Sequence, residues 1–124
     1  MGRLEGKVAV ITGATSGIGA ATVEAYCAEG ARVVFCGRNV ELGEAVQARQ
    51  PRGSAVYIQA DVLREEDIAR VIQTAVDRWG RLDILFNNAG GPSNRPGHRH
   101  AVNIEDVDEE SFKHAMWFLC GTYM

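Results

Sequence analysis

Three glycines near the N-terminus constrain this chain more than any other feature of its sequence. Residues 7–19 read Lys-Val-Ala-Val-Ile-Thr-Gly-Ala-Thr-Ser-Gly-Ile-Gly, so the apolar run Val8–Ile11 is followed by Gly13, Gly17 and Gly19. The apolar run predicts a buried strand, and the pattern after it predicts a helix. A helix that starts at a glycine turn offers unpaired N–H groups and the positive end of its macrodipole to an anion. We therefore expect a phosphate at this turn; the alternative is a tight turn without a ligand.

The remaining chain alternates between strand and helix patterns. Apolar runs predict strands at residues 7–12, 32–36, 54–59 and 83–86, and helical patterns lie at 17–29, 40–49 and 65–79. Short connections between these elements predict parallel crossovers and a doubly wound α/β sheet of strand order 3-2-1-4. Ligands bind such sheets where the strand order changes direction, here between the first and fourth strands. The length predicts one domain, residues 1–124.

Helical spacing also predicts which faces pack on the sheet. In the first helix the small and apolar series is Ile18, Ala21, Thr22 and Ala25. The third helix has the clearest pattern, Ile68, Val71, Ile72, Ala75, Val76 and Trp79, which we assign to the core rather than to a site. Gly80 is expected to end it. Residues 91–107 predict a long loop, and a last helix is expected to start near Asp108.

Composition and charge exclude several classes of function. The net charge of −3 gives no electrostatic reason to bind nucleic acid or an anionic membrane, and no apolar run reaches the length of a membrane span. The N-terminus lacks the apolar core of a signal peptide. An odd number of cysteines, three, favours reduced thiols and a cytoplasmic protein over a disulfide framework. His98 and His100 have no neighbouring ligand residues, so we expect no metal site.

A second motif accompanies the glycine turn. Asn87-Asn88-Ala89-Gly90 directly follows the fourth apolar run, and the turn itself reads Thr-Gly-x-x-x-Gly-Ile-Gly from Thr12 to Gly19. These two motifs, in this order and at this separation, resemble the fingerprints of the short-chain dehydrogenase/reductase family. The resemblance implies a Rossmann-type fold and an NAD(P)-dependent oxidoreductase that moves hydride between its cofactor and an alcohol or carbonyl.

The resemblance also implies which residues contact the nicotinamide dinucleotide. The pyrophosphate loop and its phosphate contacts correspond to Gly13, Ser16, Gly17, Ile18 and Gly19. The adenine contacts correspond to Asp61 and Val62, and the ribose on the nicotinamide side to Asn88, Ala89 and Gly90. In such proteins the threonine at position 12 braces the first strand against the Asn-Asn-Ala-Gly turn.

The end of the second strand favours NADP over NAD. A carboxylate there accepts hydrogen bonds from the ribose 2′-hydroxyl and repels a 2′-phosphate, but this position is Gly37, followed by Arg38. A guanidinium matches a phosphate in charge and geometry. We predict NADP(H); NAD is the alternative if Arg38 only stacks on adenine. Gly37→Asp is expected to shift the preference toward NAD.

The catalytic pair of the family is missing from this sequence. Its Tyr-x-x-x-Lys motif places both side chains on one helical face, where the tyrosine acts as acid or base. Tyr26, Tyr57 and Tyr123 have no lysine four residues later. The resemblance covers almost the whole chain but only about the N-terminal half of a family member. We therefore expect a truncated chain without catalytic residues.

Two further expectations follow from this truncation, and two alternative functions stay open. The fourth strand would be an exposed edge and the last helix, with Met116, would be half covered, so either could mediate homo-oligomerisation. The first alternative function is a non-catalytic NAD(P)-binding module or interaction protein. A methyltransferase-like nucleotide binder is the second, against which the Asn-Asn-Ala-Gly motif counts.

Overall fold

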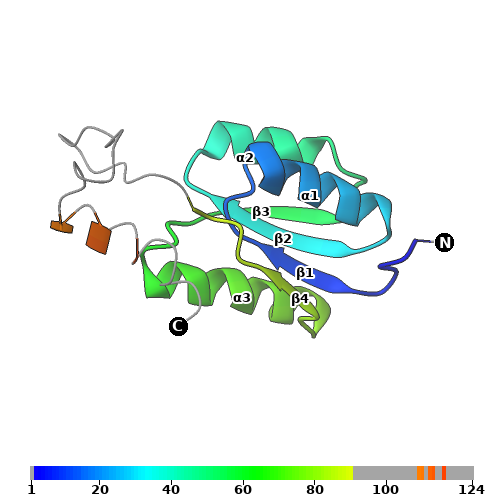
Figure 1. Cartoon of the computed structure of the whole chain (residues 1–124). Helices are drawn as coiled ribbons and strands as arrows, with labels where there is room; N and C mark the ends of the chain where they lie inside the picture. The colour runs from blue at the N-terminus through cyan, green and yellow to red at the C-terminus, as the bar shows by residue number, and fades with distance from the viewer. Residues whose placement is uncertain (1, 91–108, 111, 114–115, 117–124) are drawn as a thin grey trace.

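The chain folds into one parallel sheet with helices on both faces (Figure 1). A computed structural model describes residues 2–90, 109, 110, 112, 113 and 116. The strands are β1 (Val8–Ile11), β2 (Arg32–Gly37), β3 (Ala55–Gln59) and β4 (Ile84–Phe86). Within residues 2–90 the helices are α1 (Gly17–Ala28), α2 (Val40–Ala48) and α3 (Glu65–Trp79). Every strand pair is parallel and the order is β3-β2-β1-β4, which confirms the predicted α/β topology.

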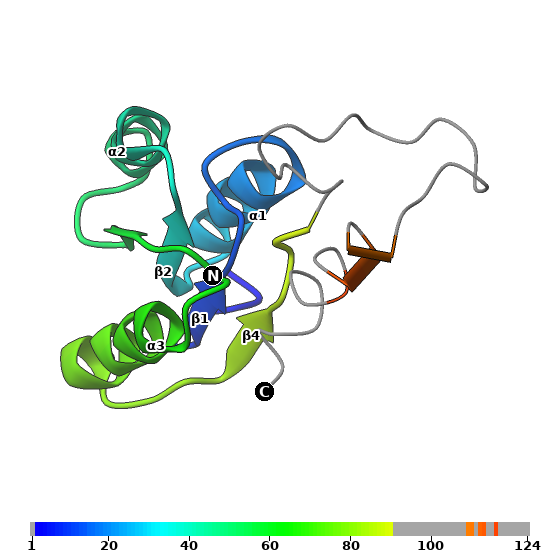
Figure 2. The ribbon, with the colours of Figure 1, turned by 90° about the vertical axis from the view of Figure 1, so that its left-hand side faces the viewer.

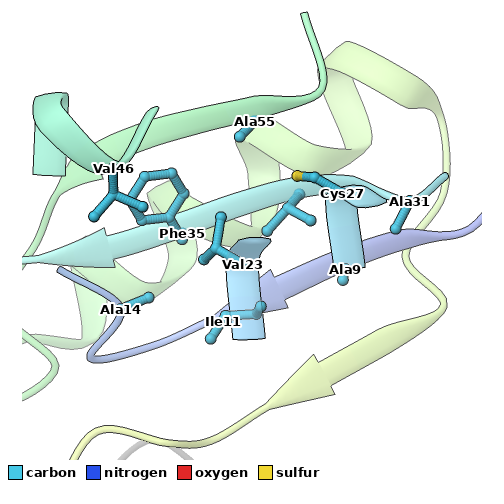
Figure 3. Packing of buried hydrophobic residues seen from close by; sticks show 10 residues of the cluster. Ala9, Ile11, Ala14, Val23, Cys27, Ala31, Phe35, Val46 and Ala55 are labelled. Carbon is cyan, nitrogen blue, oxygen red and sulfur yellow. The ribbon is translucent and has the colours of Figure 1, made fainter. Parts of the chain in front are cut away.

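The three layers explain why the central strands are so apolar. Helices α1 and α2 cover one face of the sheet, and α3 covers the other (Figure 2). All four residues of β1 are therefore buried, as expected for a parallel strand covered on both faces. On the α1 side, Ile11 and Phe35 from the sheet meet Val23 and Cys27 from the helix (Figure 3). This core holds the C-terminal ends of β1 and β2 in place.

The buried face of α1 differs from the predicted one. The residues that pack on the sheet are Gly19, Val23 and Cys27, spaced four residues apart. None of the predicted face is buried, and the side chain of Ile18 is 74% exposed. Small and apolar residues occur on all faces of α1, so their spacing in the sequence does not identify the face that packs on the sheet. In α3 the pattern is sharper, and Val71 and Ala75 are buried as predicted. Val76, also predicted to lie in the core, is 42% exposed.

The ends of the elements lie within one or two residues of the predicted ones. Strand β2 is one residue longer than predicted because Gly37 pairs with Gln59 of β3. Gly80 ends α3 as predicted, with a φ of 74° and its N–H donated to the carbonyl of Val76 at 2.7 Å. The predicted loop 91–107 lies outside the described residues.

The predicted last helix lies only partly within the described residues. Residues 109, 110, 112, 113 and 116 are helical, and Lys113 Nζ lies 2.6 Å from Glu109 Oε1. The predicted start at Asp108 lies outside the described part, as do His98 and His100.

One carboxylate joins β4 to β1 at the end of the sheet opposite the glycine turn. The Val8 N–H donates to Asp83 Oδ2 at 2.8 Å, and the Asp83 N–H donates to the Val8 carbonyl at 2.9 Å. Arg81 Nη2 lies 2.6 Å from Asp83 Oδ1. The Arg81 hydrogen bonds, with that from Val8, lower the pKa of the Asp83 carboxyl, so it stays ionised as the acceptor.

Candidate functional site

A cavity of about 420 Å³ lies at the C-terminal ends of the strands, where the sheet order changes direction. All the predicted site residues except Gly17 and Gly19 line it. The cavity is also lined by Thr15, Gly37 and Ala60. Thr15 lies inside the glycine-turn motif and Ala60 directly precedes Asp61, but no sequence pattern indicates that either residue lines the cavity. Gly37 stands where a carboxylate would favour NAD. The fold thus brings four separate segments to one opening.

Two glycines let the β1–α1 turn pass close to the β4 segment. Gly13 has a φ of 63°, a left-handed conformation that favours glycine, and a Cβ there would lie 3.1 Å from the Ala89 nitrogen. Gly19 has no such φ, but a Cβ there would overlap the Gly13 carbonyl and lie 2.7 Å from Asn88 Nδ2. Position 13 therefore requires glycine both for its left-handed backbone conformation and for the close approach of Ala89. Position 19 requires glycine only because neighbouring atoms leave no room for a Cβ.

Hydrogen bonds fix the turn against the segment after β4. Thr12 is 2% exposed, and its Oγ1 accepts the Ala89 N–H at 3.0 Å. Asn88 Nδ2 donates to the Gly13 carbonyl at 3.1 Å, and the Thr12 N–H donates to the Phe86 carbonyl at 3.1 Å. The expected brace by Thr12 is confirmed. These hydrogen bonds hold the glycine turn and the Asn-Asn-Ala-Gly segment together at the same cavity.

The start of α1 carries an unneutralised positive potential. The first N–H groups of any helix lack intrahelical acceptors. Ser16 is the N-cap residue but its side chain makes no cap hydrogen bond, and the first turn contains no acidic residue. The first turn of α3, in contrast, contains three. The α1 terminus is thus free to accept the negative charge of a phosphate from outside the chain.

The other end of the cavity is built by β2 and β3. The Gly37 carbonyl accepts the Tyr57 hydroxyl at 2.7 Å and the Ala60 N–H at 3.2 Å. Burial raises the pKa of Tyr57, which keeps its hydroxyl protonated as a donor. The Arg38 side chain is exposed and, within residues 2–90, makes no hydrogen bond or ion pair. A guanidinium without an internal partner is available to an anion.

Asp61 has a partly engaged carboxylate beside this guanidinium. Its Oδ1 accepts the Leu63 N–H at 2.9 Å, and its own N–H donates to Asp67 Oδ2 at 2.9 Å. The second oxygen of Asp61 remains able to accept from an amino group of a bound base. The amide donors of the turn therefore suit the diphosphate of a nucleotide. The Asp61 carboxylate suits its base, and the Arg38 guanidinium suits a further phosphate.

Behind the cavity lies a buried thiol. The Ala14 N–H donates to the Cys36 carbonyl at 3.0 Å, which ties the turn to β2. Cys36 is fully buried, and burial raises the pKa of its thiol to about 11. It is therefore neutral at physiological pH and serves as a small apolar residue.

Comparisons with known proteins agree with this site. The sequence profile described as short chain dehydrogenase matches residues 7–117. Tropinone reductase-like 1 from Erythroxylum coca is 51% identical over 88 residues, which cover 71% of this chain and 32% of that protein. L-fucose dehydrogenase from Oryctolagus cuniculus is 39% identical over 122 residues, 98% of this chain and 40% of that protein. Short-chain dehydrogenase reductase 3a from Arabidopsis thaliana is 38% identical over 106 residues, 86% and 41% of the two chains.

The chain belongs to the short-chain dehydrogenase/reductase family of oxidoreductases, whose members use NAD or NADP. It spans about a third to two fifths of the length of these relatives. No helix in the part of the chain that the structure describes is long and apolar enough to cross a membrane.

Proposed function

We propose that residues 1–124 form a single dinucleotide-binding unit that holds NADP(H) for an oxidoreductase of alcohols or carbonyls. The observation that carries this proposal is the cavity at the switch of strand order, where the glycine turn and Arg38 meet. The residues fit the cofactor, because the first turn of α1 has no acidic residue and no side-chain cap, and the exposed Arg38 lines the same cavity. The names of the relatives, a tropinone reductase-like protein and a fucose dehydrogenase, support this class of substrate.

Each part of the nucleotide has a proposed partner. The N–H groups from Ser16 to Gly19 bind the pyrophosphate, which sits at the positive end of α1. Asp61 and Val62 hold the adenine, and Arg38 binds the ribose 2′-phosphate. Asn88, Ala89 and Gly90 line the ribose on the nicotinamide side. When bound, the nicotinamide supplies or accepts the hydride, and the described residues bind and orient it.

The choice of NADP over NAD rests on charge at the end of β2. Position 37 has no carboxylate to repel a 2′-phosphate, and Arg38 lacks an internal partner among residues 2–90. An arginine–phosphate contact is stronger than a neutral hydrogen bond and is often bidentate. NAD remains the alternative, in which Arg38 stacks on adenine without contacting a phosphate.

A second candidate is a module that binds the dinucleotide without turning it over. The observation that favours it is the missing Tyr-x-x-x-Lys motif, since no group in this sequence is assigned to proton transfer.

For either function we also propose that the protein is cytoplasmic and that it self-associates. The β4 edge supports self-association, because Leu85 is 43% exposed there and β4 pairs with β1 alone among the described strands.

Calorimetric titration of the chain with NADPH and NADH tests the binding proposal. We expect NADPH to bind about tenfold more tightly or better, as a charged hydrogen bond allows. The fragments 2′,5′-ADP and 5′-AMP should reproduce this difference. Equal affinity for the two dinucleotides would contradict the NADP assignment, and no binding of either would contradict the proposed function. Turnover of an alcohol and ketone panel separates the enzyme from the module.

A further inference from the structure

The side chain of Thr15 fills the space above Gly37. A Cβ at position 37 would overlap Thr15 Cγ2 and lie 3.0 Å from its Oγ1 and 3.3 Å from its Cβ. All three contacts are with one residue of the glycine turn, and both residues line the same cavity. Thr15 is partly buried, and no hydrogen bond of its hydroxyl is found within residues 2–90.

Space, rather than backbone conformation, keeps position 37 a glycine. Its φ is not among the positive values in the chain, so its conformation is open to other residues. It is the last residue of β2 and pairs with Gln59. Its carbonyl accepts from Tyr57 and Ala60, which prevents the strand end from moving away from the turn. A side chain at position 37 must therefore displace Thr15.

We propose that Thr15 is a specificity-determining residue, which excludes a side chain from position 37 and so keeps a carboxylate away from the adenosine ribose. This inference rests on the proposed binding of NADP(H). The 2′-phosphate then meets Arg38 with no acid beside it. Selectivity then depends on two features: the cation at Arg38, and the pair Thr15 and Gly37 that keeps a carboxylate away from it. The predicted switch Gly37→Asp thus requires a smaller residue at position 15.

The first experiment measures the coupling without nucleotide. Gly37→Ala, Gly37→Asn and Gly37→Asp are each made with Thr15 and with Thr15→Ser, which removes only Cγ2. With Thr15, each change at position 37 should lower the melting temperature by about 5 °C or more, as overpacking does. Thr15→Ser should restore at least half of this loss. Gly37→Ala adds the smallest side chain and is the variant least prone to unfold. Its melting temperature can therefore be measured even if the larger substitutions prevent folding.

The second experiment measures NADP⁺ and NAD⁺ affinities of the same variants. Gly37→Asp with Thr15→Ser should reduce the NADP⁺/NAD⁺ preference about tenfold further than Gly37→Asp alone, the scale of one charged hydrogen bond. Gly37→Asn with Thr15→Ser is the matched control, because it has the same bulk without the charge and should change the preference far less.

Distinct results overturn the inference and the proposed function. The inference fails if Thr15→Ser does not restore stability, or if Gly37→Asp alone switches the preference as far as the double variant. If the unchanged chain binds neither nucleotide, the proposed function fails, and the melting temperatures still decide whether Thr15 and Gly37 are coupled.

Discussion

The two ends of the cavity are constructed in different ways. At the turn end, main-chain groups and close contacts around Gly13, Gly19 and Asn88 form the wall, and hydrogen bonds from buried or half-buried groups hold it. At the β2 end, the exposed Arg38 and the half-exposed Asp61 form the wall. The turn end depends on the fold itself, whereas the exposed side chains at the β2 end can change with little cost to the fold.

This difference separates two kinds of recognition. The turn presents N–H groups to any diphosphate, so it selects the class of ligand and not the individual member. Arg38 and its neighbours act on the ribose 2′ position, so they select among members of that class. Substitutions at the turn should affect both dinucleotides and stability together. Substitutions of the exposed Arg38 at the β2 end should affect one dinucleotide and leave stability unchanged.

Gly19→Ala should have the largest effect. The added Cβ overlaps the Gly13 carbonyl and contacts Ala14, so the turn and the start of α1 must separate. We expect the free energy of unfolding to fall by about 3 kcal/mol, at the upper end for overpacking. Affinity for NADPH and NADH should fall together, because the displaced turn no longer presents its N–H groups to the diphosphate that both share.

The matched control for Gly19→Ala is Gly17→Ala in the same turn. Its Cβ would meet nothing within 4 Å, and only its φ of 58° opposes the change. Denaturant unfolding should show a loss of about 1 kcal/mol for a left-handed alanine. Equal losses for the two variants would contradict the close approach at Gly19.

Arg38→Met should act at the β2 end alone. It keeps much of the length of the side chain and removes its charge, so NADPH affinity should fall about tenfold to a hundredfold while NADH affinity changes little. Stability should stay within about 0.5 kcal/mol because the side chain is exposed. Arg52→Met, at an exposed position before β3, is the control and should alter neither affinity.

Thr12→Val should sharpen the comparison with a smaller change at the turn end. Valine is nearly isosteric but leaves the Ala89 N–H without its acceptor, which should cost about 1 kcal/mol of unfolding free energy. Calorimetry should show equal losses of NADPH and NADH affinity. Thr22→Val, which removes a hydrogen bond to the Ile18 carbonyl on α1, should cost less. A loss confined to NADPH would contradict the division between the two ends.

Asp83→Asn should have the smallest effect and should alter neither end of the cavity. The Arg81 hydrogen bonds, with that from Val8, lower the pKa of Asp83 in the folded chain, so its ionised form contributes stability above the unfolded pKa of about 4. Asp83→Asn should therefore lower the melting temperature at pH 7. The difference from the unchanged chain should shrink as the pH falls below about 4, through the folded pKa. A difference that persists at pH 2 would contradict this assignment.

The sequence predicted those parts of the fold that depend on local patterns. Apolar runs and glycine turns placed the strands, and the two motifs located the cavity at the correct edge. The buried face of α1 could not be predicted, because Val23 and Cys27 compete with equally small residues on the other faces. The contact between Thr15 and Gly37 could not be predicted either, since it depends on how closely the turn approaches the end of β2.

The buried Cys36 thiol can be used to detect local unfolding of the central strands. A thiol with no exposed surface and a pKa of about 11 cannot react with an alkylating reagent until β2 leaves the sheet. The labelling rate at Cys36 in the native protein therefore measures how often the central strands separate. A nucleotide that bridges the turn and the β2 end should slow this labelling in proportion to its occupancy.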